Sequence, residues 1–243
     1  VLGKCLPHSH RFDIVTKTPS FTDIPESARV GHLKRVFERS LTRLGTNRAY
    51  GLLMHHADAL LKPGGEALYE AMTALKHAGK VARIGASIYE PEQVDRLLER
   101  FAIDLIQVPV NVLDQRLVAG GNLDRLKKAG VEIHARSVFL QGVLLMTPAE
   151  LPAHFDPVKP LLRRYHGRLS AHGLDPIGAA VGFVTGLPQI DTVIIGVNTL
   201  LQFSEVLKRY GSVPEHGEFR EFAVNDRTII NPTLWPAQCA HFV

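Results

Sequence analysis

The sequence predicts an α/β protein, a (β/α)8 barrel of the TIM type, on three observations. Expected strands and helices alternate along the chain from residue 12 to residue 210. The strands are continuous apolar runs, which is typical of a parallel sheet covered by helices. Nearly every strand also ends in a polar or small residue, as in barrels that place their active site at the carboxyl ends of the strands.

Length and composition fit one domain over residues 1–243. The chain has 45% hydrophobic and 21% charged residues, which are ordinary globular values. The formal net charge is +4, and no basic run indicates a nucleic-acid partner. No apolar run is long enough to predict a membrane span. Two cysteines, Cys5 and Cys239, form neither a disulfide framework nor a metal motif, and they favour a cytoplasmic location.

Four strand-and-helix steps are expected in the first half of the chain. Each helix follows from apolar residues at helical spacing, such as Leu33, Phe37 and Leu41, with a glycine near the end of most of them. The helix that opens at "EPEQ" begins with proline and acidic residues, as helix starts prefer. The expected strands are 12–18, 50–56, 81–87 and 103–110, and the expected helices are 26–45, 64–80, 90–101 and 122–130.

The second half is expected to contain fewer strands and a longer irregular section. Its strands are 131–137 and 191–197, its helices are 154–173, 175–187 and 200–210, and an irregular tail begins at Gly211. Six strands leave two architectures, a doubly wound sheet or an eight-unit barrel that lacks two units. A dinucleotide-binding doubly wound sheet requires G-x-G-x-x-G after its first strand, but this chain has "TKTPSF" there. We therefore expect the barrel.

Polar residues at the strand ends are the candidate site. Lys17 alone could be a rim lysine whose stem reaches solvent. His55 and His56 are adjacent, so strand geometry would let only one of them face the barrel interior, and His56 is expected to be structural. Metal-dependent barrel hydrolases need an inward-facing H-x-H pair on a strand, and none of the expected strands carries one, so no metal is expected. The series is Lys17, His55, Ser87, Gln107 with Asn111, Ser137, and Gly196 with Asn198.

In their order, these strand segments resemble the aldo-keto reductase superfamily over essentially the whole chain. "DIVTKT" is similar to that family's third strand, with its catalytic lysine at Lys17. "YGLLMHHAD" is similar to the fourth strand, with the catalytic histidine at His55. The remaining matches are "GKVARIGAS", "DLIQVPVN", "ARSVFLQGVLL" and "IIGVNTLLQFSE".

The resemblance implies the reduction of an aldehyde or ketone, a small-molecule carbonyl substrate, with hydride from a nicotinamide cofactor. A tyrosine would give the carbonyl oxygen its proton. The ammonium group of Lys17 would lower the pKa of that tyrosine from about 10. His55 would orient and polarise the carbonyl group. The expected cofactor is NADPH, with NADH left open because the last loop lacks a basic residue for a 2′-phosphate.

The resemblance also implies a set of cofactor contacts. Ser87 and Gln107 would bind the nicotinamide carboxamide. Arg136 stands where the family has an aromatic residue, and its planar guanidinium could stack on the nicotinamide or equally form a structural ion pair. The pyrophosphate path would include Ser137 and the main chain from Leu140 to Gly142. The adenosine end would contact Gly196, Asn198, Gln202 and Glu205.

The family places an aspartate and the proton-donating tyrosine before its third strand, and none of this chain's five tyrosines matches that position. We therefore expect the first two βα units to be absent from this chain, and activity only if the full protein has them. Two other functions stay open. One is a cofactor-binding barrel with a regulatory or structural role. The other is a lyase or epimerase in which Lys17 forms a Schiff base. The oligomeric state is not indicated.

Overall fold

The computed structural model describes residues 2–7, 11–210 and 216–239. The chain groups into two compact units, Val1–Gln107 with Leu126–Glu132, and Val108–Arg125 with Ile133–Val243. The six strands of the described residues form one sheet in chain order, from β1 to β6. The predicted α/β fold with six parallel strands is therefore confirmed. The eight-unit barrel and the single-domain organisation stay predictions.

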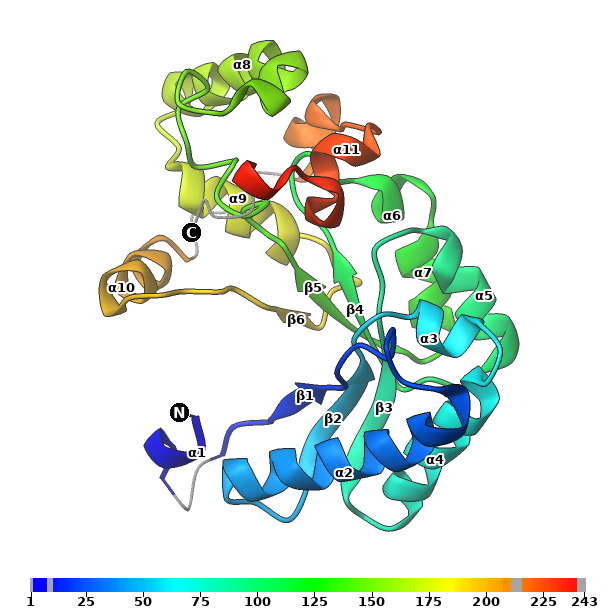
Figure 1. Ribbon diagram of the computed structural model, residues 1–243. Coiled ribbons are helices and arrows are strands. Elements are labelled where there is room, and N and C mark those ends of the chain that lie inside the picture. Colours follow the sequence, from blue (N-terminus) through cyan, green and yellow to red (C-terminus); the bar gives the residue numbers. More distant parts are fainter. Residues whose placement is uncertain (1, 8–10, 211–215, 240–243) are drawn as a thin grey trace. The chain divides into compact units, whose positions relative to one another are not determined.

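The first unit has short parallel strands with helices on one side (Figure 1). Lys17 of β1 pairs with Leu53 of β2, Leu53 pairs with Gly85 of β3, and Gly85 pairs with Leu105 of β4. Consecutive strands lie side by side, as expected for repeated βα units. The strands are β1 (Val15–Lys17), β2 (Ala49–Met54), β3 (Val81–Ser87) and the first part of β4 (Leu105–Pro109). The helices are α1 (Leu2–Cys5), α2 (Glu26–Leu44), α3 (Asp58–Leu61), α4 (Gly65–His77) and α5 (Glu92–Arg100).

Helix α2 shows why these helices form where they do. Leu33, Phe37 and Leu41 recur every four residues and are all buried, so the helix has one apolar face. Leu33 and Phe37 line the same small gap as Leu52 of β2, which places this face against the sheet. The helix ends at Gly45, whose φ of 70° suits a left-handed cap. Next to α2, helix α4 covers the same side of the sheet (Figure 1).

The second unit has one strand pair and most of its mass in helices. His134 of β5 pairs in parallel with Thr192 of β6. The pair is β5 (Glu132–Arg136), whose first residue belongs to the other unit, and β6 (Thr192–Val193). The larger helices are α7 (Asn122–Lys128), which also runs into the first unit, α8 (Lys159–Ala171), α9 (Pro176–Thr185) and α10 (Leu200–Arg209). The shorter ones are α6 (Arg116–Ala119), η1 (Ala153–Val158), η2 (His216–Phe222), α11 (Arg227–Ile230), η3 (Pro232–Leu234) and η4 (Ala237–Cys239).

Aromatic rings form much of the core of this unit. The Tyr165 ring on α8 lies 5.9 Å from that of Phe219 and 5.5 Å from that of Phe222, both edge-on. Phe183 of α9 meets Phe219 at 6.2 Å, also edge-on. Such rings bury large apolar areas and favour edge-to-face packing. The C-terminal segment is thus fixed to α8 and α9 by aromatic contacts.

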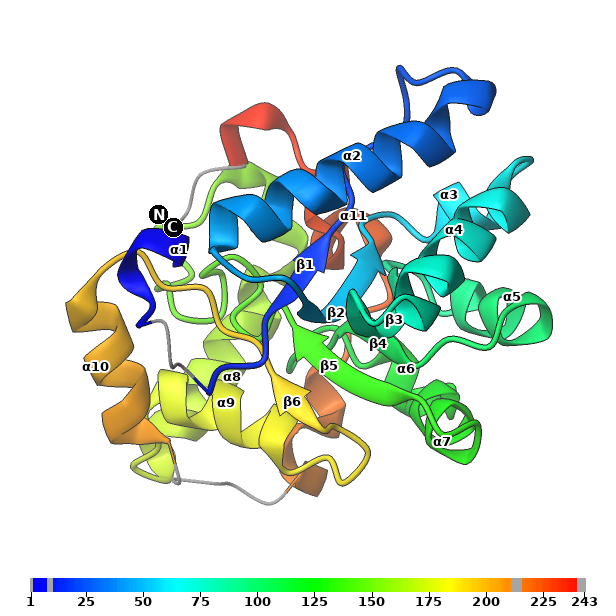
Figure 2. The ribbon, with the colours of Figure 1, turned by 90° about the horizontal axis from the view of Figure 1, so that it is seen from below.

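Helix α10 differs from the other long helices because none of its residues is buried. It lies beside α9 (Figure 2). Leu200 and Leu201 are 79% and 70% exposed. Thr199 caps the helix by accepting a hydrogen bond from the Gln202 N–H at 3.1 Å. In the part of the chain that the structure describes, no helix is long and apolar enough to cross a membrane.

Several element predictions differ from the structure, and three of the differences are the largest. Phe12 was expected in a buried strand, but its side chain is 68% exposed and β1 begins only at Val15. The last strand was expected over 191–197, but β6 has two residues, because only Thr192 and Val193 find a partner on β5. The tail contains short helices instead of being irregular throughout, and its residues 211–215 and 240–243 lie outside the described residues.

Replacing Gly85 by alanine should destabilise the first unit. A β-carbon at this position would lie 1.7 Å from the Leu105 main-chain oxygen, so β3 and β4 would have to separate. We expect a loss of about 3 kcal/mol, measured as a lower urea midpoint by circular dichroism. The matched control is Gly167→Ala on α8, where a β-carbon meets nothing within 4 Å. It should be neutral or stabilising by about 0.5–1 kcal/mol. Equal midpoints for the two variants would contradict this account.

Replacing Tyr165 by phenylalanine should leave the protein equally stable or make it more stable. The buried Tyr165 hydroxyl has no hydrogen-bond partner among the described residues, so the variant loses an unpaired polar group. Tyr50→Phe is the control, because its hydroxyl donates to Glu132 at 2.6 Å, and we expect it to cost about 1 kcal/mol. Urea unfolding compares the two. A larger loss of stability in Tyr165→Phe than in Tyr50→Phe would contradict this prediction.

Replacing Tyr165 by phenylalanine should also change how the stability of the protein depends on pH. Burial, with a smaller contribution from the charge of Asp175, raises the pKa of Tyr165 above its ordinary value. The neutral hydroxyl is therefore favoured by the folded state, and stability is lost as pH rises above about 10, where the unfolded chain ionises first. Tyr165→Phe should thus gain stability relative to the natural protein in unfolding curves recorded above that pH. A difference that does not change with pH would contradict it.

Candidate functional site

Strand register brings several polar residues to one edge of the first unit. Lys17, Leu53, Gly85 and Leu105 form a row across β1 to β4, since each is paired with the next. Paired residues of parallel strands point to the same face. Lys17 is the last residue of β1, so its side chain leaves the sheet at the carboxyl edge of this face.

Ser87 and Gln107 lie one step further along the same face. They are paired with each other, and each comes two residues after a member of the row. Both are buried, and Gln107 is only 5% exposed. No hydrogen bond joins the Gln107 side chain to another described residue. A buried carboxamide normally has partners, so this group can accept and donate hydrogen bonds to a bound molecule. A ligand carboxamide, such as that of nicotinamide, fits this donor and acceptor set.

Glycines make the interior of this face narrow. A β-carbon on Gly51 would lie 2.8 Å from Leu105 Cδ2 and 3.1 Å from Val15 Cγ1. Side chains of β1 and β4 thus meet over β2, where a larger residue would keep them apart. The space below Lys17 and Gln107 is therefore filled by apolar side chains, and a ligand must approach from the carboxyl edge.

Thr18 connects the two strands that carry Lys17 and His55. Its N–H donates to the Leu53 oxygen at 2.9 Å, which extends the pairing one residue beyond β1. Its hydroxyl accepts a hydrogen bond from the His55 N–H at 3.2 Å and donates to Met54 Sδ at 3.2 Å. Thr18 is buried, so these bonds are shielded from water. Sequence reasoning missed this residue, although a threonine at the end of the predicted strand, directly after Lys17, was a usable signal.

Two histidines and a tyrosine form a stack at this edge. The rings of His55 and His56 lie 4.5 Å apart at an angle of 24°, and the ring of Tyr89 lies 6.0 Å from His56. The expectation that the two histidines point to opposite sides assumed strand geometry, but β2 ends at Met54, before both of them. Gln93 Oε1 accepts from the Tyr89 N–H at 2.9 Å and holds the segment that carries the third ring.

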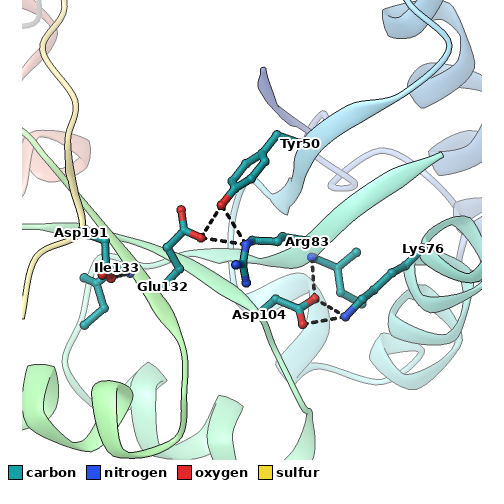
Figure 3. Close-up of polar contacts among 8 residues, drawn as sticks. Tyr50, Lys76, Arg83, Asp104, Glu132, Ile133 and Asp191 are labelled. Carbon is teal, nitrogen blue, oxygen red and sulfur yellow. Dashed lines mark hydrogen bonds and ion pairs between the residues drawn. The ribbon is translucent and has the colours of Figure 1, made fainter. Parts of the chain in front are cut away.

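The opposite, amino end of these strands is occupied by paired charges (Figure 3). Tyr50 donates to Glu132 at 2.6 Å, and Arg83 Nε lies 2.8 Å from both the Tyr50 hydroxyl and Glu132 Oε2. Lys76 bonds both oxygens of Asp104, at 2.6 Å and 2.7 Å. Burial and the hydrogen bond to Glu132 raise the pKa of Tyr50. Because each charged group here has a partner, we interpret this end of the strands as stabilising the fold.

In the second unit, the loop after β5 has an unusual main chain. Ser137, Leu140 and Gln141 have φ angles of 62°, 45° and 53°, and Gly142 follows at 90°. Positive φ is uncommon outside glycine, and such residues cluster at ligand sites. Asn111 holds the loop by donating from Nδ2 to the Ser137 oxygen at 3.0 Å. Arg136 Nη1 donates to Ser137 Oγ at 3.1 Å, so its guanidinium lies over the start of the loop.

The residues expected at the adenosine end of a cofactor lie after β6 and on α10. Gly196 and Asn198 are exposed in the segment before the helix. Gln202 Oε1 accepts a hydrogen bond from the Asn198 N–H at 2.7 Å, which is a helix-capping role the sequence reading did not foresee. Glu205 Oε1 lies 3.8 Å from Arg209 Nη1. Among the described residues, no group of three or more His, Cys, Asp or Glu side chains could hold a metal ion.

Comparison with known proteins identifies the family. The sequence model of the Aldo/keto reductase family matches residues 1–214. The chain belongs to the aldo/keto reductase family. The resemblance noted in the strand segments is therefore confirmed. Aldo/keto reductases are oxidoreductases that use nicotinamide cofactors, generally NADPH, and act on small-molecule carbonyl substrates.

Solved structures agree with this fold. The chain is similar to the aldo-keto reductase AKR11C1 from Bacillus halodurans in two forms. The holo form gives a TM-score of 0.70 at 20% identity, over 99% of this chain and 79% of that chain. The apo form gives a TM-score of 0.71, with the same identity and coverage. No curated protein sequence matches the chain.

Removing the Thr18 hydroxyl should loosen the segment that carries His55. Thr18→Val keeps the shape of the side chain but leaves the His55 N–H without its acceptor, which should cost about 1–2 kcal/mol. The His55 amide should then exchange its hydrogen faster, as measured by NMR. Thr18→Ser keeps the hydroxyl and should retain the protection. Equal His55 exchange rates in the two variants would disprove this role.

Proposed function

We propose that this aldo/keto reductase chain reduces an aldehyde or ketone to an alcohol by hydride transfer from NADPH. The observation that carries the proposal is the position of Lys17 and His55 at the ends of neighbouring strands, at the same sheet edge as the buried carboxamide of Gln107, which bonds no other described residue. A charged donor, an imidazole and a carboxamide site at one edge are what the reaction needs. The same proposal includes an eight-unit barrel that forms a single domain. It also includes a cytoplasmic location, which the two free cysteines favour.

Each residue of the first unit has a distinct role in the proposal. When bound, the nicotinamide cofactor supplies the hydride. Lys17 holds a positive charge that stabilises the ionised form of the proton donor and so lowers its pKa. His55 donates a hydrogen bond to the carbonyl oxygen and fixes its orientation, with its main chain held by Thr18. Ser87 and Gln107 bind the carboxamide and determine which ring face meets the substrate.

The second unit would hold the rest of the cofactor. The strained main chain of the loop, from Ser137 through Leu140 to Gly142, would bind the pyrophosphate, and Arg136 would stack on the nicotinamide ring. Gly196, Asn198, Gln202 and Glu205 would contact the adenosine end. Gln202 keeps its amide nitrogen for such a contact, because its capping bond uses only the oxygen. Whether the protein prefers NADPH to NADH is tested separately, by comparing its affinity for the two cofactors.

The proton donor is the part of the proposal that depends on the full protein. Tyr50 and Tyr69 donate their hydroxyls to Glu132 and to the Ala102 oxygen, and Tyr165 is enclosed in the core. Tyr89 stacks on His56, and Tyr210 follows α10. The family resemblance implies a further tyrosine, together with an aspartate, in the full protein. If it were lacking, the supported function would be a cofactor-binding protein without catalytic activity.

Replacing Lys17 by methionine tests the proposal. In the full protein, Lys17→Met should lower kcat for aldehyde-dependent NADPH oxidation by about 100-fold or more, because the proton donor loses its neighbouring charge. NADPH affinity, followed by fluorescence, should change little. Lys34→Met is the matched control, because Lys34 lies exposed on α2.

Three outcomes separate the alternatives. Unchanged turnover in Lys17→Met would contradict the role of this lysine. NADPH binding without turnover in the natural protein would favour the non-catalytic function. Covalent trapping of substrate by borohydride, lost in Lys17→Met, would instead identify a Schiff-base enzyme.

A further inference from the structure

A pocket of about 460 Å³ lies next to the His55–His56–Tyr89 stack, in the first unit. Its lining residues come from the loop after β1, the start of α2, and α3 with the residues on either side of it. Figure 1 shows where these elements lie. Its volume is in the range of small-molecule sites. None of the proposed catalytic or cofactor residues lines it, so it needs an explanation of its own.

The charges that line the pocket are unequal. Arg29 and Lys62 are cations, His56 adds an imidazole, and Asp58 is the one acidic side chain in the lining. Asp58 is already bound, since Gln93 Nε2 donates to it at 2.7 Å and Lys62 lies 3.9 Å away. The pocket therefore has an excess of positive charge.

Arg29 is the cation in the lining that has no ion pair with Asp58. Its Nε donates to the Ile24 main-chain oxygen at 3.1 Å, which fixes the stem of the side chain. No hydrogen bond or ion pair joins its two terminal nitrogens to another described residue. A guanidinium presents paired donors that match the oxygens of a carboxylate or phosphate. The hydroxyls of Ser20 and Thr22, which also line the pocket, share a hydrogen bond of 2.7 Å, so the one that accepts it can donate its own proton to the same group.

The position of the pocket links it to the proposed chemistry. His56 lines the pocket and its ring stacks on that of His55 at 4.5 Å, so the pocket begins one ring away from the residue proposed to orient the carbonyl. Phe21 and Ala59 supply apolar surface in the lining for a short carbon chain. A molecule with its carbonyl at His55 could place its other end beside Arg29.

We propose that this pocket binds the oxyanion end of the substrate, so that the preferred substrates are short carbonyl compounds that carry a carboxylate or a phosphate. The binding site follows from the lining residues alone, and its use for a substrate rests on the function proposed above. The pocket is an anion site in the protein with or without cofactor. A carboxylate and a phosphate both present anionic oxygens to Arg29, and the measurements below show which of the two binds more tightly.

Direct binding is measured first, with probes that have no carbonyl group. Butyrate and propyl phosphate are titrated into the protein while the His56 ring signals are followed by NMR. We expect the signals to shift, and Arg29→Gln to weaken binding about tenfold because a charge-assisted hydrogen bond is lost. Arg39→Gln, on the exposed side of the same helix, should leave binding unchanged. Lys62→Gln serves as a second variant, should Arg29→Gln fail to fold. The tighter of the two probes identifies the anion.

Turnover is measured second, by comparing 4-oxobutanoate with butanal. The natural protein should have a higher kcat/KM for 4-oxobutanoate, and Arg29→Gln should remove most of this preference through KM, with little change for butanal. Equal probe binding in Arg29→Gln, Lys62→Gln and Arg39→Gln would overturn the anion site. Probe binding without any preference for the charged aldehyde would overturn its role in substrate selection. Turnover of neither aldehyde would count against the reductase function, while the binding data would still decide the site.

Discussion

The close approach of β3 and β4 is the constraint on which the first unit depends. Gly85 has no side chain, and this allows the Leu105 main chain to lie where a β-carbon would be 1.7 Å from its oxygen. The pairing of these two residues sets the register that places Ser87 beside Gln107. The same register, continued through β2, aligns Lys17 with them. A site made from four separate segments is thereby determined by main-chain pairing rather than by contacts among the site residues.

The two ends of these strands use polar groups in opposite ways. At the amino end, Tyr50, Arg83 and Glu132 satisfy one another, and Lys76 is paired with Asp104. At the carboxyl end, the Gln107 carboxamide bonds no other described residue, and in the pocket next to the histidine stack the same holds for the terminal nitrogens of Arg29. A buried carboxamide without a protein partner costs stability, so its position at this end is expected where a ligand completes the bonding. Barrel proteins divide stability and chemistry between the two ends in the same way.

Local sequence patterns predicted much of the fold and less of the site. Strand 81–87 was predicted with its observed bounds, because an apolar run with a small residue at its end is a local feature. The predictions that Phe12 is buried and that the last strand spans 191–197 were wrong, since both features depend on whether a partner strand lies alongside. The bond from His55 to Thr18 joins residues 37 positions apart, which no local pattern could reveal. The capping role of Gln202 was available from the Thr-x-x-Gln spacing.

The loop after β5 has a consequence for attempts to engineer this protein. Ser137, Leu140 and Gln141 each adopt a conformation that glycine would adopt more easily, and each costs roughly 1–3 kcal/mol. Glycine in place of Ser137 or Gln141 would relieve the strain, so a screen for heat resistance would favour it, whereas Leu140 is buried and its loss would leave a cavity. The same change would free a main chain that side chains now restrict to one arrangement. Selection for thermal tolerance alone would therefore work against the rigidity of this loop.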